Sequence, residues 1–218
     1  MRHTGAASIV ARAAAPQAGD AFFARLRSEA EEALRREGDL GGFLYDAILS
    51  QATLEDAIGR RIAERLQGAE ASYGVILQAF AEGFARDPSF GVALRADLAA
   101  VLERDPACRR YLEPALYFKG FHAIQTYRLS HALWRLGRSD FALLLQSRSA
   151  QVFQTDIHPG ARIGKGFFLD HATGVVIGAT AIVEDDVSML HGVTLGGSGR
   201  SAGERHPKVR RGVLIGAG

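Results

Sequence analysis

Cysteine, tryptophan and long hydrophobic runs are scarce in this 218-residue chain. Its one cysteine, Cys108, excludes an intrachain disulfide and fits a reducing compartment, so we expect the protein in the cytoplasm. No apolar run approaches the roughly 20 residues that a membrane-spanning helix needs, so we expect no membrane partner. Residues 1–19 lack acidic side chains, but no lipophilic core with a cleavage site follows them. We interpret them as a flexible arm rather than a targeting peptide.

An excess of charge of one sign is also missing. The 26 lysine and arginine residues nearly balance the 24 acidic residues, which gives a formal net charge of +2. The basic pairs Arg35–Arg36 and Arg109–Arg110 are typical of solvated helix faces, so we expect no nucleic-acid partner. With 47% hydrophobic residues, the composition is that of a globular protein with one large domain or two small ones.

Residues 20–154 show the hydrophobic spacing of amphipathic helices. Apolar residues recur every three or four positions from Phe22 onward. Thr53 and Asp56 resemble a capping box that opens a helix ending near Leu66. The same spacing, with Gly, Asp and Pro between the segments, predicts further helices over 72–84, 89–102, 121–136 and 139–153.

From Thr155 onward the hydrophobic period changes to six, with a slip of two residues between Val175 and Ile177. A hexapeptide repeat is typical of a parallel β-helix, in which each aliphatic side chain points inward and stacks on its copy in the next coil. The strands of a β-sandwich, the alternative, would be longer and would alternate with period two. The inward positions are Ile157, Ile163, Leu169, Val175, Ile177, Val183, Met189, Leu195, Val209 and Ile215.

We therefore predict an α+β chain, with an N-terminal all-helical domain (20–154) followed by a left-handed parallel β-helix (155–218). A polar segment interrupts the repeat over residues 196–208, which predicts a loop. The repeat starts afresh at 215–218, so we expect the β-helix to be incomplete at this point. A coil of this kind leaves strand edges and a flat outer face exposed, so we expect another protein surface to pack against it.

Polar residues beside the inward positions are candidates for chemistry. Because Ile157 and Leu169 point inward, Asp156, Asp170 and His171 face the outer surface. A neutral histidine with a carboxylate behind it is a general-base dyad, which an alcohol needs before it attacks an acyl group. The alternative is that these are ordinary surface turn residues.

The predicted loop carries a second group, Arg205 and His206. A guanidinium binds a carboxylate through two parallel hydrogen bonds, so Arg205 suits an amino-acid substrate, although a solvated loop is the alternative. Cys108 lies in the helical part without an adjacent base, which favours direct acyl transfer over an acyl-cysteine route. His122 and His131 stand among apolar helical neighbours and are interpreted as packed or surface residues.

Several segments closely resemble bacterial serine acetyltransferases. The resemblance runs from about Phe84 to Gly218 and rests on RDPACRRYLEPALYFKGFHAIQTYRLSHALW, DIHPGARIGKGFFLDHATG, VTLGGSG and ERHPKVRRGVLIGAG. It implies an enzyme that transfers an acetyl group from acetyl-CoA to the hydroxyl of L-serine, giving O-acetyl-L-serine and CoA. This reaction is the first step of cysteine biosynthesis.

The resemblance also implies roles for individual residues. His171 is the general base and Asp156 is its carboxylate partner. Acetyl-CoA is a co-substrate rather than a tightly bound cofactor and lies between adjacent β-helices, near Gly197 and Ala217. No metal is implied.

On the substrate side, the resemblance implies that Asp105 and Asp170 bind the ammonium group of L-serine. Arg205 binds its carboxylate, and His206 helps to place the substrate. The family forms homotrimers or hexamers made of two trimers, and L-cysteine inhibits it by competing at the serine site. Its C-terminal tail docks into O-acetylserine sulfhydrylase, a partner we expect only if such a tail follows residue 218.

Three other functions stay open. Another acyltransferase of the same fold would act on a sugar or antibiotic hydroxyl, but would not explain the long helical part or Arg205–His206. A hydratase of the γ-carbonic anhydrase kind would need three histidines around zinc, for which His158, His171 and His191 are candidates. A non-catalytic scaffold for the sulfhydrylase is the third.

Overall fold

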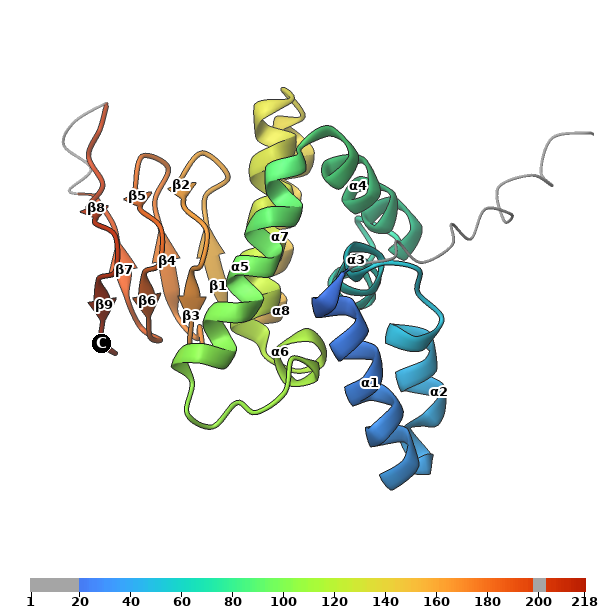
Figure 1. The fold of residues 1–218 in the computed structure, drawn as a ribbon. Helices are drawn as coiled ribbons and strands as arrows, with labels where there is room; N and C mark the ends of the chain where they lie inside the picture. The colour runs from blue at the N-terminus through green and yellow to red at the C-terminus, as the bar shows by residue number, and fades with distance from the viewer. Residues whose placement is uncertain (1–19, 198–202) are drawn as a thin grey trace, which may run out of the picture.

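The structure is a computed structural model that describes residues 20–197 and 203–218, so the predicted arm over 1–19 lies outside the described residues. Eight α-helices occupy the first part of the described chain (Figure 1). They are α1 (Ala21–Arg36), α2 (Gly41–Leu44), α3 (Leu54–Leu66), α4 (Tyr73–Arg86), α5 (Pro88–Arg104), α6 (Leu112–Leu116), α7 (Lys119–Arg135) and α8 (Ser139–Phe153). A 3₁₀ turn (Gly38–Leu40) and a π-helical turn (Tyr45–Leu49) flank α2. Within the described ranges, no helix combines the length and the apolar character of a membrane span.

The long helices agree with the predicted segments. The capping box is confirmed, since the Thr53 hydroxyl accepts a hydrogen bond from the Asp56 amide at 3.0 Å ahead of α3. The pattern did not predict α6, because five residues with Pro114 at their centre are too few to show a helical period.

Short parallel strands make up the second part of the described chain. They are β1 (Thr155–Ile157), β2 (Arg162–Ile163), β3 (Phe168–Leu169), β4 (Val175–Ile177), β5 (Ile182–Val183), β6 (Ser188–Met189), β7 (Thr194–Leu195), β8 (Lys208–Val209) and β9 (Leu214–Ile215). They form three sheets with the orders β1-β4-β7, β2-β5-β8 and β3-β6-β9, and every pairing is parallel. Successive strands therefore occupy the three edges of a coil, which confirms the predicted succession of helices and parallel coils.

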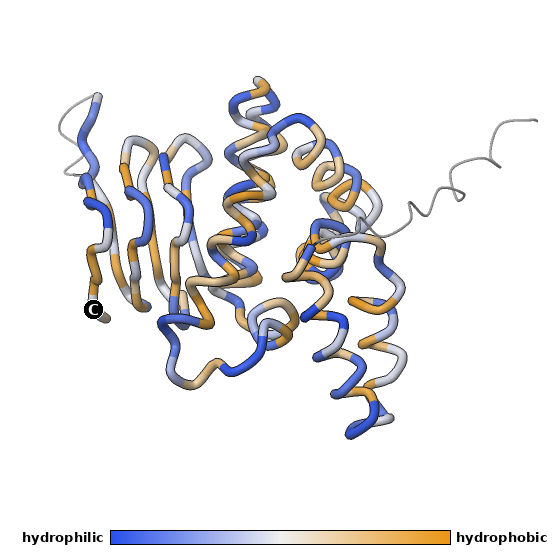
Figure 2. The backbone as a smooth tube through the Cα atoms, in the orientation of Figure 1, coloured by the Kyte–Doolittle hydropathy of each residue, from blue (hydrophilic) through white to orange (hydrophobic). Residues whose placement is uncertain are grey.

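The predicted inward positions fill the interior of this coil. Eight of the ten are buried in one cluster, and Ile163 and Ile215 pack against it partly exposed. Figure 2 shows hydrophobic residues recurring along the strands of each sheet. The sixfold pattern therefore identified the core of the coil correctly.

The slip of two residues in the repeat has a definite place in the coil. Ile157 pairs with Ile177, 20 positions on, whereas Ile177 pairs with Leu195, 18 positions on. The first coil therefore holds two residues more than the regular repeat. They lie in the corner between β3 and β4, because β2 and β3 keep the six-residue spacing from β1.

Helix α7 packs against the first coil. The Tyr127 hydroxyl donates a hydrogen bond to the Ala161 carbonyl at 2.7 Å and accepts one from the Ile163 amide at 3.2 Å. Burial raises the pKa of Tyr127 to about 12, which keeps this hydroxyl protonated. At the start of α7, a Cβ on Gly120 would lie 2.0 Å from the Leu169 carbonyl oxygen, so the helix approaches the coil more closely than any side chain permits.

A buried ion pair joins α5, α7 and the coil. The Arg128 Nε and Nη2 atoms donate to the two carboxylate oxygens of Asp97 at 2.6 and 2.7 Å. Asp97 also accepts a hydrogen bond from the Phe167 amide at 3.0 Å, and Arg128 donates to the Gly164 carbonyl at 2.8 Å. Two charged side chains on different helices thus satisfy backbone groups of the first coil.

We predict that Gly120→Ala destabilises the protein by at least about 1–3 kcal/mol, because the new methyl group overlaps the backbone of Leu169. Gly74→Ala is the matched control. Gly74 is also the second residue of a helix, but a Cβ there meets nothing within 4 Å, so this variant should gain up to about 1 kcal/mol. Urea unfolding would measure both, and equal stabilities for the two variants would contradict the close approach.

A second prediction concerns His122, which is fully buried. Its Nδ1 accepts from Arg65 Nη1 at 2.7 Å and its Nε2–H donates to the Ala115 carbonyl at 2.8 Å, so the ring is neutral. Burial lowers the pKa of His122 to about 3, whereas an unfolded histidine has a pKa of about 6.5. Between these values only the unfolded chain takes up the proton. The His122 contribution is therefore complete above pH 6.5 and falls with pH by up to about 1.4 kcal/mol per unit.

Replacing His122 by glutamine should remove this contribution to the pH dependence. The free energy of unfolding, measured in urea between pH 5 and 7, should fall less steeply toward low pH in His122→Gln than in the wild type. His191→Gln, at an exposed histidine, serves as the control and should keep the wild-type slope. Parallel slopes for the wild type and His122→Gln would disprove the prediction.

Candidate active site

The corner between β3 and β4 carries the predicted general base. Residues 170–174 form this His171 corner, where His171 and Ala172 have φ angles of +56° and +62°. Residues with a Cβ rarely adopt positive φ, and consecutive examples store backbone strain of the kind found at functional sites. Two narrow turns hold the conformation, from the Ala172 amide to the Asp170 carbonyl (2.6 Å) and from the Thr173 amide to the His171 carbonyl (2.8 Å). In this conformation the His171 side chain is 72% exposed.

A pocket of about 350 Å³ opens beside this corner, between the coil and the segments around α5, α6 and α7. Three predicted site residues line it together, namely Asp105, Asp170 and His171. Asp105 follows the last residue of α5, and its Oδ1 accepts from the Ala107 amide at 2.8 Å. Asp170 Oδ2 lies 3.6 Å from His171 Nε2. Two carboxylates in one pocket favour a cationic group, and the imidazole beside them can accept a proton.

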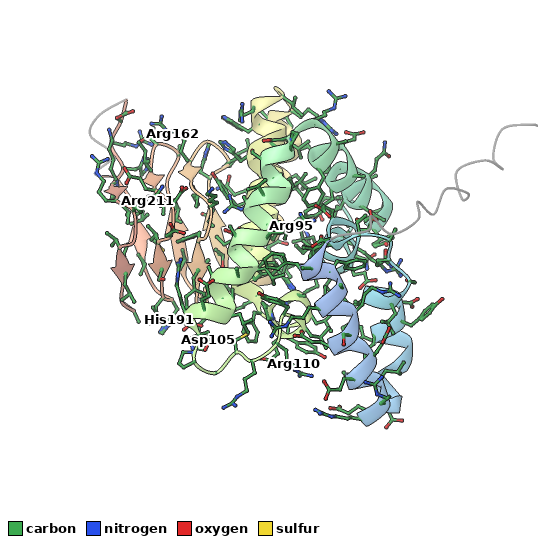
Figure 3. All side chains as sticks on the ribbon, in the orientation of Figure 1. Arg95, Asp105, Arg110, Arg162, His191 and Arg211 are labelled. Atoms are coloured by element: carbon green, nitrogen blue, oxygen red, sulfur yellow. The ribbon has the colours of Figure 1, made fainter. Side chains whose placement is uncertain are left out.

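The rest of the pocket wall is mostly apolar, with Val101, Tyr117, Phe118, Phe121, Phe168 and Leu169. Figure 3 shows Asp105 and His191 at the same end of the coil. His191 stands one coil above His171, and the two ring centroids are 5.8 Å apart. Ala217 lies above His191 in the same stack of corners, since the next residue, Gly218, donates its amide to the His191 carbonyl at 3.2 Å.

Lys119 also lines this pocket, although no motif or spacing pointed to it. Its ammonium group donates hydrogen bonds to the Thr173 hydroxyl and, at 3.2 Å, to Gln154 Oε1. Burial lowers the pKa of Lys119, with a smaller contribution from the charge of Arg65. Lys119 thus ties the first residue of α7 to the His171 corner.

Arg205 and His206 lie against a different corner of the coil, between β4 and β5. We call residues 178–181 the Thr180 corner. His206 Nδ1 lies 2.7 Å from the Thr180 hydroxyl oxygen, and the Arg205 amide donates to that oxygen at 3.2 Å. Gly197 lies here as well, since a Cβ on it would be 2.8 Å from Arg205 Cγ.

Asp156 lies in β1, and its Oδ1 accepts from Gln146 Nε2 at 2.6 Å. Among the described residues, no hydrogen bond or ion pair connects Asp156 with His171. Its charge acts on His158 instead, where burial lowers the pKa and Asp156 partly opposes that shift. In one chain the predicted residues therefore form two groups, with Asp105, Asp170 and His171 in one and Arg205 and His206 in the other.

The remaining candidates, His158 and Cys108, lie outside both groups. His158 packs edge-on against Trp134 with ring centroids 5.3 Å apart, away from the pair of His171 and His191, so the three do not converge. Within the described ranges, no group of three or more potential ligands is arranged to hold a metal ion. Cys108 is buried, and burial raises its pKa to about 12, which suppresses the thiolate.

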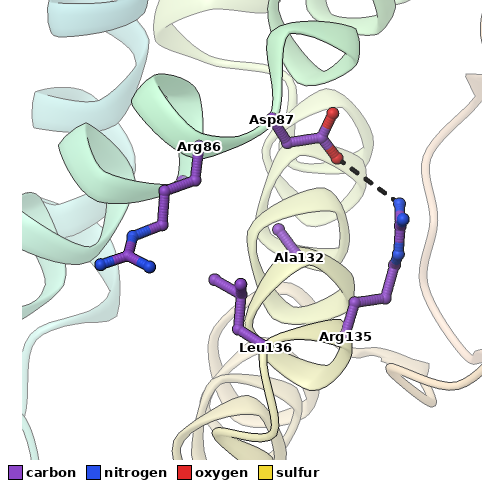
Figure 4. A pocket seen from close by; sticks show the side chains of 6 residues that line it. Arg86, Asp87, Ala132, Arg135 and Leu136 are labelled. Atoms are coloured by element: carbon purple, nitrogen blue, oxygen red, sulfur yellow. Dashed lines mark ion pairs between the residues drawn. The ribbon is translucent and has the colours of Figure 1, made fainter.

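A second hollow of about 200 Å³ lies between α4 and α7 (Figure 4). Its polar groups include Arg135 and Asp87, which form an ion pair at 3.8 Å, and Arg86. None of the predicted site residues lines it. With no histidine or cysteine in its wall, it offers no general base comparable to His171.

Comparisons with known proteins agree on one family. The family described as "Serine acetyltransferase, N-terminal" matches residues 22–126. A probable serine acetyltransferase of Oryza sativa subsp. japonica is 50% identical over 215 residues, which cover 98% of this chain and 68% of the relative. The chain spans between 60 and 71% of the length of the similar curated serine acetyltransferases from rice, Arabidopsis and Escherichia coli.

Solved structures give the same result. Serine acetyltransferase from Brucella abortus strain S19, in complex with coenzyme A, superposes with a TM-score of 0.89 at 57% identity and covers 91% of this chain and 79% of its own. Soybean serine acetyltransferase complexed with serine superposes with a TM-score of 0.87 at 46% identity, over 90% of this chain and 81% of its own.

Proposed function

The chain belongs to the serine acetyltransferase family, and we propose that it transfers the acetyl group of acetyl-CoA to the hydroxyl of L-serine, giving O-acetyl-L-serine and CoA. The observation that carries the proposal is the pocket beside the His171 corner. In it, Asp105 and Asp170 face a site suited to an ammonium group, next to an imidazole. A serine bound by its ammonium group there has its hydroxyl within the reach of a general base.

His171 accepts the hydroxyl proton while the serine oxygen bonds to the carbonyl carbon of the thioester. The tetrahedral adduct then collapses, the carbon–sulfur bond breaks, and the proton passes from the imidazolium to the CoA thiolate. No acyl-enzyme is needed, in keeping with the buried Cys108 and its raised pKa. Transfer is direct, and acetyl-CoA acts as co-substrate.

The serine carboxylate is bound by Arg205, with His206 beside it. Because these residues lie on the Thr180 corner and His171 lies on another corner, the complete site takes the two corners from two neighbouring copies. Asp156 lies on β1, which pairs with β4, the strand that leads into the Thr180 corner. Where two copies meet, Asp156 of one copy becomes the carboxylate partner of His171 of the other. Acetyl-CoA occupies the groove between the copies, near Gly197 and Ala217.

The same reasoning extends to assembly and inhibition. The coil winds left-handed and packs as a homotrimer, and two trimers join through the helical part (20–154) as a hexamer. L-Cysteine shares the ammonium and carboxylate groups of L-serine and differs only in its sulfur atom, so it competes at the serine site as an inhibitor. The cytoplasm remains the proposed location, and docking into O-acetylserine sulfhydrylase is proposed only for a chain that carries the C-terminal tail.

We predict that His171→Ala lowers kcat by about two orders of magnitude or more, the usual effect of losing a general base, with a much smaller change in the KM for serine. The assay is thiol release from acetyl-CoA with and without L-serine. His191→Ala, one coil above at 5.8 Å between ring centroids, is the matched control and should stay within a few fold of the wild type. Near-normal turnover by His171→Ala would remove the proposed mechanism, and serine-independent thiol release by the wild type would remove the proposed function.

A second prediction tests whether two copies build one site. His171→Ala and Arg205→Ala should each be impaired alone, the second through a raised KM for serine. When the two variants are mixed as unfolded chains and refolded together, about a quarter of the sites in a cyclic trimer regain both residues from different copies. Mixing His171→Ala with Asp170→Ala should restore nothing, since both residues come from the same corner. No gain in the first mixture would contradict the shared site.

A further inference from the structure

His206 fits against the Thr180 corner in a way that leaves its ring little freedom. A Cβ on Gly178 would lie 2.0 Å from both Cδ2 and Nε2 of His206, so only glycine leaves space for the ring. Gly178 itself is fixed in the coil, because its amide donates to the Leu195 carbonyl at 3.1 Å and its carbonyl accepts from the Ala181 amide at 3.0 Å. The ring is therefore held against a rigid part of the second coil.

Thr180 determines which nitrogen of this ring carries the hydrogen. Its backbone N–H points to His206 Nδ1 at 3.2 Å, and its hydroxyl oxygen lies 2.7 Å from the same nitrogen. A peptide N–H can only donate, so Nδ1 must present its lone pair. The neutral ring then carries its hydrogen on Nε2, which makes Nε2–H a hydrogen-bond donor.

The same hydroxyl also fixes the neighbouring arginine, since the Arg205 amide donates to Thr180 Oγ1 at 3.2 Å. One threonine side chain is thus in contact with both residues of the pair. Its oxygen accepts from the Arg205 backbone, and its hydrogen is directed at His206. A valine at this position would have the same shape but neither interaction.

We propose that Thr180 is a positioning residue that makes the pair Arg205–His206 selective for a free carboxylate. It holds His206 as an Nε2–H donor and fixes the backbone from which the Arg205 guanidinium extends, so that both present donors to one anionic group. This inference rests on the proposed function, because it concerns the carboxylate end of the serine site. It adds that selectivity for that end is set by a residue outside the loop that carries Arg205.

The test compares Thr180→Val, Thr180→Ser and the wild type with two acceptors, L-serine and L-serinamide, which replaces the carboxylate by a neutral amide. Thr180→Val should raise the KM for L-serine about tenfold and change kcat little, as expected when a hydrogen bond to a charged group is weakened. The KM for L-serinamide should hardly change, so the preference for serine falls about tenfold. Thr180→Ser keeps the hydroxyl and should retain the wild-type preference.

Thr194→Val is the matched control, because Thr194 is an exposed threonine on β7 and its hydroxyl has no hydrogen bond among the described residues. It should behave as the wild type with both acceptors. An unchanged preference in Thr180→Val, or equal losses with serine and serinamide, would overturn the inference and point to a general effect on the fold. A wild type without serine-dependent thiol release would instead remove the proposed function, so the two failures can be told apart.

Discussion

The site depends on a buried ion pair that lies outside it. Asp97 in α5 and Arg128 in α7 are almost fully buried, and both use remaining hydrogen-bonding capacity on backbone groups of the first coil. Such a pair stabilises little compared with apolar packing, but it specifies one arrangement, because separating its members leaves a buried charge that costs about 3–5 kcal/mol. Asp105 follows the end of α5, and Lys119 begins α7. The register that the ion pair imposes on the two helices therefore sets where both residues meet the His171 corner.

Much of this architecture could be predicted from the sequence, because it depends on periodic burial. Helices α1, α3 and α4 bury one face as a 3.6 period predicts, and the inward positions of the coil recur every six residues except at the two-residue slip and across residues 196–208. The Asp97–Arg128 pair could not be predicted in this way. Its members are 31 positions apart on different helices, and a buried aspartate has no pattern that distinguishes it from one on a solvated face.

Adjacency in sequence also predicted the pairs Asp170–His171 and Arg205–His206, but not that they lie on different corners. The segment over residues 196–208 breaks the repeat, so counting by six no longer says where its residues return to the coil. Their position depends instead on Gly178 and Thr180. Gly178 has no Cβ and so leaves space for the His206 ring, and the Thr180 hydroxyl contacts the Nδ1 atom of that ring. Glycine and threonine are common at the other turns of the coil as well, so the sequence does not distinguish Gly178 and Thr180 as residues that contact His206.

The two additional residues of the first coil lie where the helical part contacts it. A regular six-residue edge turns with a shorter corner, such as the one between β6 and β7 that carries His191. The two extra residues lengthen the corner between β3 and β4 and place His171 and Ala172 at positive φ, where consecutive residues with side chains are unfavourable. Contacts from outside the coil add to the two narrow turns that hold this corner. Lys119 binds Thr173, and the lack of a side chain at Gly120 lets α7 close on Leu169. The coil thus supplies the position of the proposed base, His171, and the helices add contacts to the corner that carries it.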